Sequence, residues 1–139
     1  MSNLQSEIQK ILRLAKFAKD DLKHIIGTEA VRDSKANFRD GGIDGRKWEA
    51  RKKKNRKGKA DTKPLTDTGD LGDSIDYNAD FNEVKVGTPF EWAKVHNEGG
   101  TAGRGKGFTM PKRQFLGITE RMKGKLEDKI KREIEKILK

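Results

Sequence analysis

The chain of 139 residues contains no cysteine, three prolines, two histidines and few aromatic residues. The absence of cysteine excludes a disulfide framework, a thiolate zinc site and a cysteine nucleophile. His24 and His96 are far apart in the sequence and make a poor metal site. No stretch approaches the roughly 18 apolar residues of a membrane span, and basic residues interrupt the first 30 positions, unlike in a signal peptide. We therefore expect a soluble intracellular protein with no cofactor.

Apolar residues are also scarce, at 32% of the chain, whereas charged residues reach 39% against about 25% in a typical domain. A chain of this length forms a single domain and buries roughly two-thirds of its unfolded surface. The composition predicts one domain with a small core and a heavily charged surface.

The net charge of +10 is concentrated in one segment. Residues 46–63 hold ten basic and two acidic residues, which gives +8 within the segment and +2 for the rest of the chain. Apolar residues are rare there and like charges repel, so residues 50–64 are expected to form a flexible loop anchored by Trp48. The residues predicted to contact nucleic acid or a partner are Arg46, Lys47, Arg51, Lys52, Lys53, Lys54, Arg56, Lys57 and Lys59.

Periodicity predicts the secondary structure. Apolar residues at steps of three and four indicate a helix over 4–26 that ends at Gly27, a second helix over 28–39, and a closing helix from about 119. Period-two alternation predicts a hairpin of strands near 75–79 and 84–86. A turn of helix near 68–71, a short helix over 90–97 and a strand near 108–110 complete the order.

The expected fold is α+β, with a small antiparallel sheet packed against the long N- and C-terminal helices. The single domain over residues 1–139 divides into helices (1–40), a basic flexible loop (41–65), a sheet with a short helix and a Gly-rich loop (66–118), and a C-terminal helix (119–139). Trp92 and His96 share one face of the short helix, which is expected to join the core, with a binding surface as the alternative.

Two motifs suggest chemistry. The glycine-rich run 100–107 resembles a phosphate loop, but Gly107 stands where such a loop needs Ser or Thr after the lysine. His96 could act as a general base with Glu98 beside it. No nucleophile or second site accompanies it, so a structural role is preferred and no enzymatic activity is expected.

Short motifs in a fixed order resemble the tailed-phage virion morphogenesis family, the tail-completion proteins of the head-tail joint. That family shows a "TG-L--SI" step, a "VGT" strand end, a "(Y)A-(I)HQ-G" helix and a "(I)PARPFLG" segment. The chain carries them at 68–75, 86–88, 92–99 and 110–117, preceded by Phe38, Gly45 and Trp48. Trp92, Asn97, Lys112 and Gln114 depart from the pattern, in ways that a packing role tolerates.

The resemblance implies a structural protein of a phage or prophage that completes the tail or joins head to tail as a ring of identical subunits. Its partners would be connector or tail proteins and packaged DNA, and its location the bacterial host cytoplasm and then the virion tail or neck. An exposed edge at the proline-containing segment is expected to make subunit contacts. The residues predicted for that interface are Met110, Pro111, Arg113 and Phe115.

Two other classes of function stay open. The basic segment 46–63 could make the protein a sequence-nonspecific nucleic-acid-binding protein through phosphate contacts. A hydrolase or nuclease centred on His96 is the third.

Overall fold

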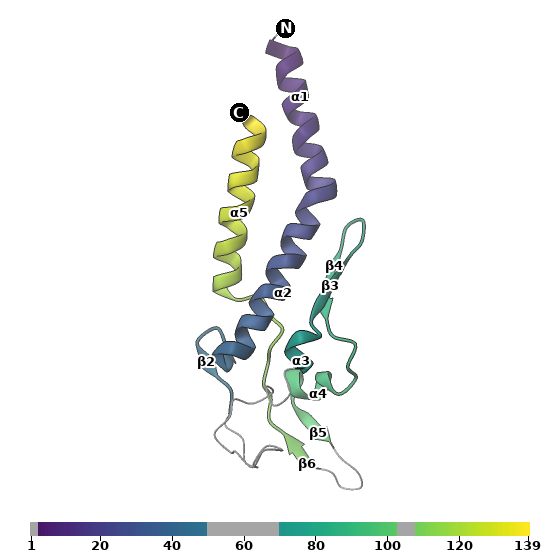
Figure 1. Ribbon diagram of the computed structural model, residues 1–139, viewed down its shortest axis with the longest axis vertical. Helices are drawn as coiled ribbons and strands as arrows, with labels where there is room; N and C mark the ends of the chain where they lie inside the picture. Colours follow the sequence, from purple (N-terminus) through teal and green to yellow (C-terminus); the bar gives the residue numbers. More distant parts are fainter. Residues whose placement is uncertain (1–2, 50–69, 103–107) are drawn as a thin grey trace.

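The computed structural model describes residues 3–49, 70–102 and 108–139. A long helix and the C-terminal helix lie side by side as a stalk, and short strands and helices form a head at one end (Figure 1). The predicted loop over residues 50–64 and most of the predicted nucleic-acid contacts lie outside the described residues.

The first part of the stalk is one continuous helical rod. It consists of α1 (Asn3–Lys16), the π-helical turn η1 (Phe17–Asp21) and α2 (Leu22–Asp40). Gly41, in the left-handed region with φ of 72°, ends α2. The predicted break at Gly27 is therefore wrong, since this glycine lies inside α2.

Close packing explains Gly27. A Cβ atom there would overlap the ring of Tyr77, a residue of the head. The glycine thus allows the head to lie against the helix. In the local sequence, a glycine required by such a tertiary contact looks the same as a glycine that ends a helix.

We expect Gly27→Ala to destabilise the protein by about 1–3 kcal/mol, because overlap with Tyr77 outweighs the gain in helix propensity. Gly124→Ala is the matched control, since nothing lies within 4 Å of a Cβ at this α5 position. The control should stabilise the protein by about 0.5–1 kcal/mol. Urea denaturation of both variants measures the change in the free energy of unfolding. Equal changes of the same sign in the two variants would contradict the packing explanation.

The π-helical turn changes which residues of α1 face the rest of the stalk. Leu22 donates its backbone N–H to the carbonyl oxygen of Phe17, five residues earlier, instead of four. The partly or fully covered residues of the rod include Ser6, Lys10 and Leu14 before the turn, Phe17 at its start, and Leu22, Ile25 and Glu29 after it. The predicted single apolar face over 4–26 is thus divided, with its first half left exposed.

Helix α5 (Glu120–Leu138) completes the stalk and runs back alongside α2 and α1 (Figure 1). Thr119 caps it by accepting a hydrogen bond from the backbone N–H of Met122, which confirms the predicted start. Between the helices, the buried carboxylate of Glu29 pairs with Lys129 at 2.8 Å, and within α2 it pairs with Arg32 at 3.1 Å.

The strands of the head form three separate antiparallel pairs among the described residues. The hairpin of β3 (Asp76–Ala79) and β4 (Val84–Gly87) confirms the predicted one, with Tyr77 opposite Val86. The other pairs are β1 (Gly42–Ile43) with β2 (Arg46–Lys47), and β5 (Gly100–Ala102) with β6 (Phe108–Met110). The α+β class is confirmed, although the predicted sheet is divided into these pairs.

Two short helices, α3 (Asp70–Asp73) and α4 (Ala93–Glu98), complete the head. Its core lies where α2 meets α3, α4 and the segment before α5, and it includes Trp48, the predicted anchor. None of the helices in the described part of the chain is both long and apolar enough to cross a membrane. The core residues are Phe38, Trp48, Leu71, Ile75, Ala93 and Phe115.

Candidate assembly site at the junction of stalk and head

A polar network centred on Arg121 joins the end of α2 to the start of α5. The Nε of Arg121 donates to the carboxylate of Asp33 at 2.7 Å, and its Nη atoms reach the carboxylate of Asp40 at 2.8 Å and Asn37 Oδ1 at 3.0 Å. Thr119 donates to the second oxygen of Asp33 at 2.8 Å. One guanidinium thus fixes the angle between two helices.

The network also shifts the ionisation of its members. The hydrogen bond from Arg121 holds the pKa of Asp40 below its usual value, with nearby Arg39 and Lys47 adding to the effect. The hydrogen bond to Asp33 raises the pKa of Arg121. Along the stalk, burial opposes ionisation of Glu29, but Lys129 and Arg32 together lower its pKa. These groups remain charged at neutral pH and hold the helices together.

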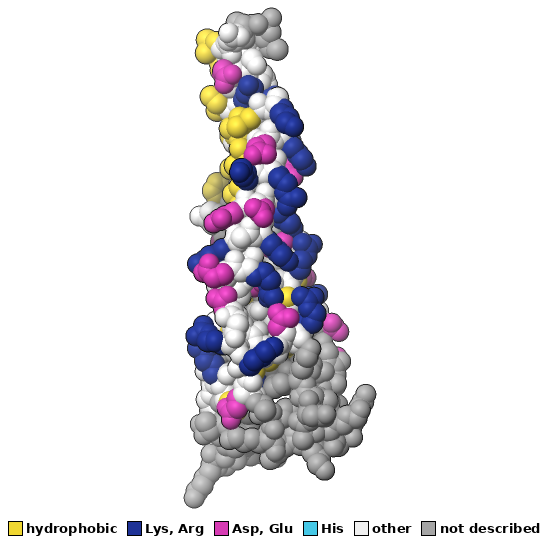
Figure 2. Space-filling model, turned by 90° about the vertical axis from the view of Figure 1, so that its left-hand side faces the viewer, with side chains coloured by type: hydrophobic (Ala, Val, Ile, Leu, Met, Phe, Trp, Pro, Cys, Tyr) yellow, Lys and Arg dark blue, Asp and Glu magenta, His cyan; other side chains and the backbone are white. Residues whose placement is uncertain are grey.

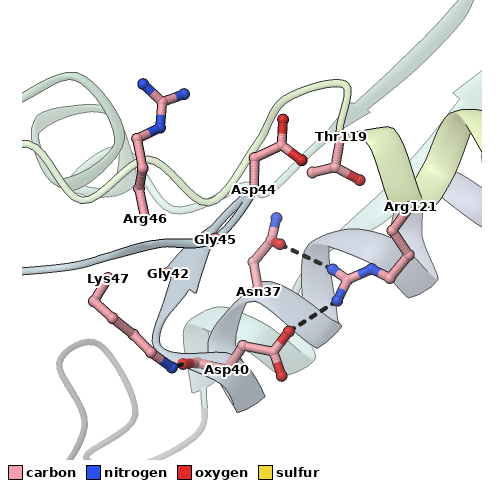
Figure 3. Close-up of a pocket in the computed structure, with 9 residues that line it drawn as sticks. All are labelled: Asn37, Asp40, Gly42, Asp44, Gly45, Arg46, Lys47, Thr119 and Arg121. Carbon is pink, nitrogen blue, oxygen red and sulfur yellow. Dashed lines mark hydrogen bonds and ion pairs between the residues drawn. The ribbon is translucent and has the colours of Figure 1, made fainter.

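A pocket of about 170 Å³ lies beside this network and is bordered by the β1–β2 turn (Figure 3). Its polar groups are largely paired: Lys47 donates to the carbonyl of Asp40 at 2.8 Å, and Asp44 accepts from the backbone N–H of Glu120 at 3.1 Å. Arg46 extends away from the network (Figure 3). The junction is built as a structural joint, with Arg46 and Lys47 exposed where the basic segment begins.

Residues 113–116 are held in the head by side chains from three other segments. Asn37 donates to the carbonyl of Phe115 at 2.9 Å, and Trp48 donates to that of Gln114 at 2.9 Å. Asn97 accepts from the backbone N–H groups of Phe115 and Leu116. Three of the segments that carry the family resemblance, at Trp48, Asn97 and residues 114–116, therefore meet in one structural cluster.

The predicted subunit-interface residues lie in different environments. Phe115 is 1% exposed and belongs to the core, and Arg113 is buried and donates to the carbonyl of Glu49 at 3.0 Å. Their side chains already have contacts within the subunit. Pro111 is partly exposed, and Met110 is the last residue of β6. The contact between subunits therefore stays a prediction for the edge that these two residues form.

His96 has a structural environment. Its ring packs edge-on against Trp92, and its backbone carbonyl accepts a hydrogen bond from Arg113 at 2.8 Å. Burial, with a smaller contribution from Arg113, lowers the pKa of His96 and favours the neutral imidazole. Nδ1 is buried without a hydrogen-bond partner in the described structure, so no carboxylate there orients it as a base.

The prediction that Trp92 joins the core is wrong. Its side chain is 48% exposed and stacks on Phe90, and Ala93 takes the buried position beside it. The helix α4 begins after Trp92, so the expected helical spacing does not place this side chain inside.

The helix α1 carries an exposed apolar surface, although the spacing of its residues predicts one apolar face along the whole of residues 4–26. Hydrophobic side chains gather along one edge of the upper stalk, and charged side chains lie beside them and continue over the lower stalk (Figure 2). In the sequence, the only indication of this exposure is that the residues covered in place of these apolar side chains are mostly polar. This α1 stripe consists of Leu4, Ile8, Ile11, Leu12 and Ala15, all exposed.

Of the predicted contacts to nucleic acid or a partner, Arg46 and Lys47 are described, and both lie on β2. Residues 103–107 of the glycine-rich run lie outside the described residues. So do the other predicted contacts, which are Arg51, Lys52, Lys53, Lys54, Arg56, Lys57 and Lys59. No group of three or more histidine or acidic side chains in the described ranges is arranged to hold a metal ion.

The chain belongs to the phage virion morphogenesis family, whose model matches residues 1–135. That match covers the stalk, the junction and the head, so it includes every element described above. The protein is thus a member of a family that serves the building of phage particles.

A second comparison supports the same origin. Over 56 residues the chain is 45% identical to Mu-like prophage FluMu G protein 2 of Haemophilus influenzae. The aligned part is 40% of this chain and 41% of the relative, so the chain spans about two-fifths of that protein's length. No solved structure matches the chain.

Proposed function

We propose that this protein completes the phage tail or joins it to the head, as a non-enzymatic component that assembles into a ring of identical copies. The family match over residues 1–135 is the observation that carries this proposal. The match to a Mu-like prophage protein supports it. The protein would act in the bacterial host cytoplasm during assembly and remain in the tail or neck of the virion.

The shape of the protein suits such a role. A rod with a head at one end packs beside copies of itself with all heads at one level, as a closed ring requires. Heads would present Arg46 and Lys47, and the basic segment that follows them, to packaged DNA or to a connector or tail protein. The edge at Met110 and Pro111 is the proposed contact between neighbouring heads.

Deletion of the gene from the encoding phage or prophage tests this function. Electron microscopy of induced lysates is expected to show DNA-filled heads and separate tails, and a plasmid copy should restore joined particles. A copy with His96→Ala should restore them as well, because no bond is made or broken. Normal infectious particles without the gene would refute the proposal.

The concentrated charge of the basic segment favours a second candidate, nonspecific nucleic-acid binding, and gives a separate prediction. Neutralising Lys52, Lys53 and Lys54 with glutamine should change stability by less than about 0.5 kcal/mol, because the sequence predicts these charges in a loop outside the core, where charges contribute little. DNA affinity should fall, and the slope of log affinity against log salt should decrease by as much as about 2.7, or about 0.9 per phosphate contact.

Fluorescence anisotropy with labelled duplex DNA at several salt concentrations measures both quantities. A control variant with glutamine at Lys123, Lys131 and Lys136 removes the same charge from α5 and should retain the wild-type slope. Unchanged DNA affinity and unchanged particle assembly in the Lys52–Lys54 variant would leave the segment with a role in solubility alone.

A further inference from the structure

The α1 stripe is exposed along the stalk for the length of α1. Leu4 is 71% exposed, Ile8 46%, Ile11 62% and Leu12 57%. The other large hydrophobic side chains that are exposed in the described structure are Phe81, Trp92, Ile118 and Leu138, which come from separate places in the chain. A contiguous apolar surface of this kind on a charged protein marks a contact site.

The helix α5 does not cover the stripe. Arg13 of α1 donates to the carbonyl of Ile137 in α5 at 3.2 Å, and the covered side of α1 is formed by Ser6, Lys10 and Leu14. The apolar residues lie on a different side of the helix. The covered side of α1 therefore consists of two polar residues and one leucine, and the more apolar side of the helix is left exposed.

The spacing of the stripe indicates what covers it. Leu4, Ile8, Ile11 and Ala15 follow each other at steps of four, three and four, and Ala18 continues the pattern. This is the seven-residue repeat with which one helix packs against another helix of the same repeat. No charged residue interrupts these positions, so the partner surface must be apolar too.

We propose that the α1 stripe is a self-association surface that packs against the α1 stripe of a second copy of this chain. In another copy, the outer side of α5 is charged, and the remaining exposed apolar side chains of the described residues are scattered. The matching extended surface is the stripe itself. The inference goes beyond the proposed ring, because a surface that packs against its own copy closes a pair, whereas a ring also needs a contact between two different surfaces.

The expected association is weak. Fifteen residues of helix span about 22 Å, and a stable interface buries about 800 Å² on each side, more than this stripe alone supplies. Copies with a net charge of +10 also repel each other. Added salt screens that repulsion, so self-association should increase with salt, whereas phosphate contacts weaken.

Sedimentation equilibrium of the full chain in about 0.1 M and about 1 M salt tests the inference, since the Debye length falls from about 10 to about 3 Å. The wild-type mass should rise with protein concentration, and more steeply at high salt. Ile8→Gln with Ile11→Gln should weaken association more than about tenfold, because two buried apolar contacts are lost. The fold should survive, since both side chains are exposed in the single chain.

Gln9→Ala with Lys16→Ala is the control, because these two residues are also exposed on α1 but lie outside the stripe. It should associate at least as well as the wild type. A wild-type chain that stays monomeric at the highest soluble concentration, or a stripe variant that associates equally well, would overturn the inference.

Crosslinking gives a second measurement, because the chain has no cysteine of its own. Ile11 lies midway between Leu4 and Ala18, so two paired stripes bring their Ile11 positions together in either orientation. Ile11→Cys should form disulfide-linked dimers under mild oxidation much faster than Gln9→Cys. Equal rates for the two variants would count against the stripe as the contact.

The outcomes separate this inference from the proposed function. A chain that does not self-associate but is still required to join heads and tails overturns the inference alone. A chain that associates through the stripe but is dispensable for particle assembly overturns the proposed function alone.

Discussion

Replacing Arg121 with alanine is expected to destabilise the protein by about 3 kcal/mol, because it leaves a buried carboxylate without its cation. The side chain of Asp33 is 2% exposed and would retain only the hydrogen bond from Thr119 among the contacts described above. Asn37 and Asp40 would lose a donor as well. The loss is large because the charge of Asp33 stays in place while its partner is removed.

Urea denaturation measures this loss, and Arg39→Ala is its control. Arg39 also approaches Asp40, at 3.9 Å, but is 74% exposed, so its removal should change stability by less than about 1 kcal/mol. Combining Arg121→Ala with Asp33→Asn should recover part of the loss, since the buried charge is then absent. If Arg121→Ala and Arg39→Ala have equal effects, the network does not hold the junction.

The second large effect is expected at Phe115. Phe115→Ala should destabilise the protein by about 3–5 kcal/mol, since it removes a fully buried ring from a small core. The ring packs against Phe38 with a centroid separation of 5.1 Å. The hydrogen bonds of Asn37 and Asn97 to this segment involve its backbone and remain possible, so the loss reports on packing.

Phe81→Ala is the matched control, because Phe81 lies in the β3–β4 turn and is 79% exposed. Its removal should change stability by less than about 0.5 kcal/mol. Natural domains are stable by about 5–15 kcal/mol. If Phe115→Ala leaves too little folded protein to measure, Phe115→Leu gives a smaller, measurable loss of stability. Equal stability of the Phe115 and Phe81 variants would show that the ring is not a core residue.

The sequence predicted the elements whose signals are local. The apolar periodicity gave both terminal helices, Thr119 marked the start of α5, and alternation gave the β3–β4 hairpin in its observed place. Trp48 was predicted as the anchor of the segment before residue 50, and it is buried in the core. Each signal lies within a few residues of the feature that it predicts.

The failures at Gly27, Asp33 and Phe115 involve contacts between distant parts of the chain. Gly27 resembles a helix end but is required by Tyr77, 50 positions away in the sequence. Asp33 and Arg121 are 88 positions apart, and nothing in their local sequence indicates that they meet. For the same reason Phe115, which follows a proline expected at a sheet edge, was not recognised as part of the core.

The turn η1 sets the orientation of α1 relative to α2. In the present π-helical form, each residue before the turn is displaced by one position relative to α2. Closing the same five residues as regular α-helix would rotate α1 by about 100°. Leu4, Ile8, Ile11 and Ala15 would then continue the line of Leu22 and Ile25 towards α5. The hydrogen-bond pattern of five residues thus decides whether the N-terminal helix is part of the subunit's own interior or is available to its neighbours.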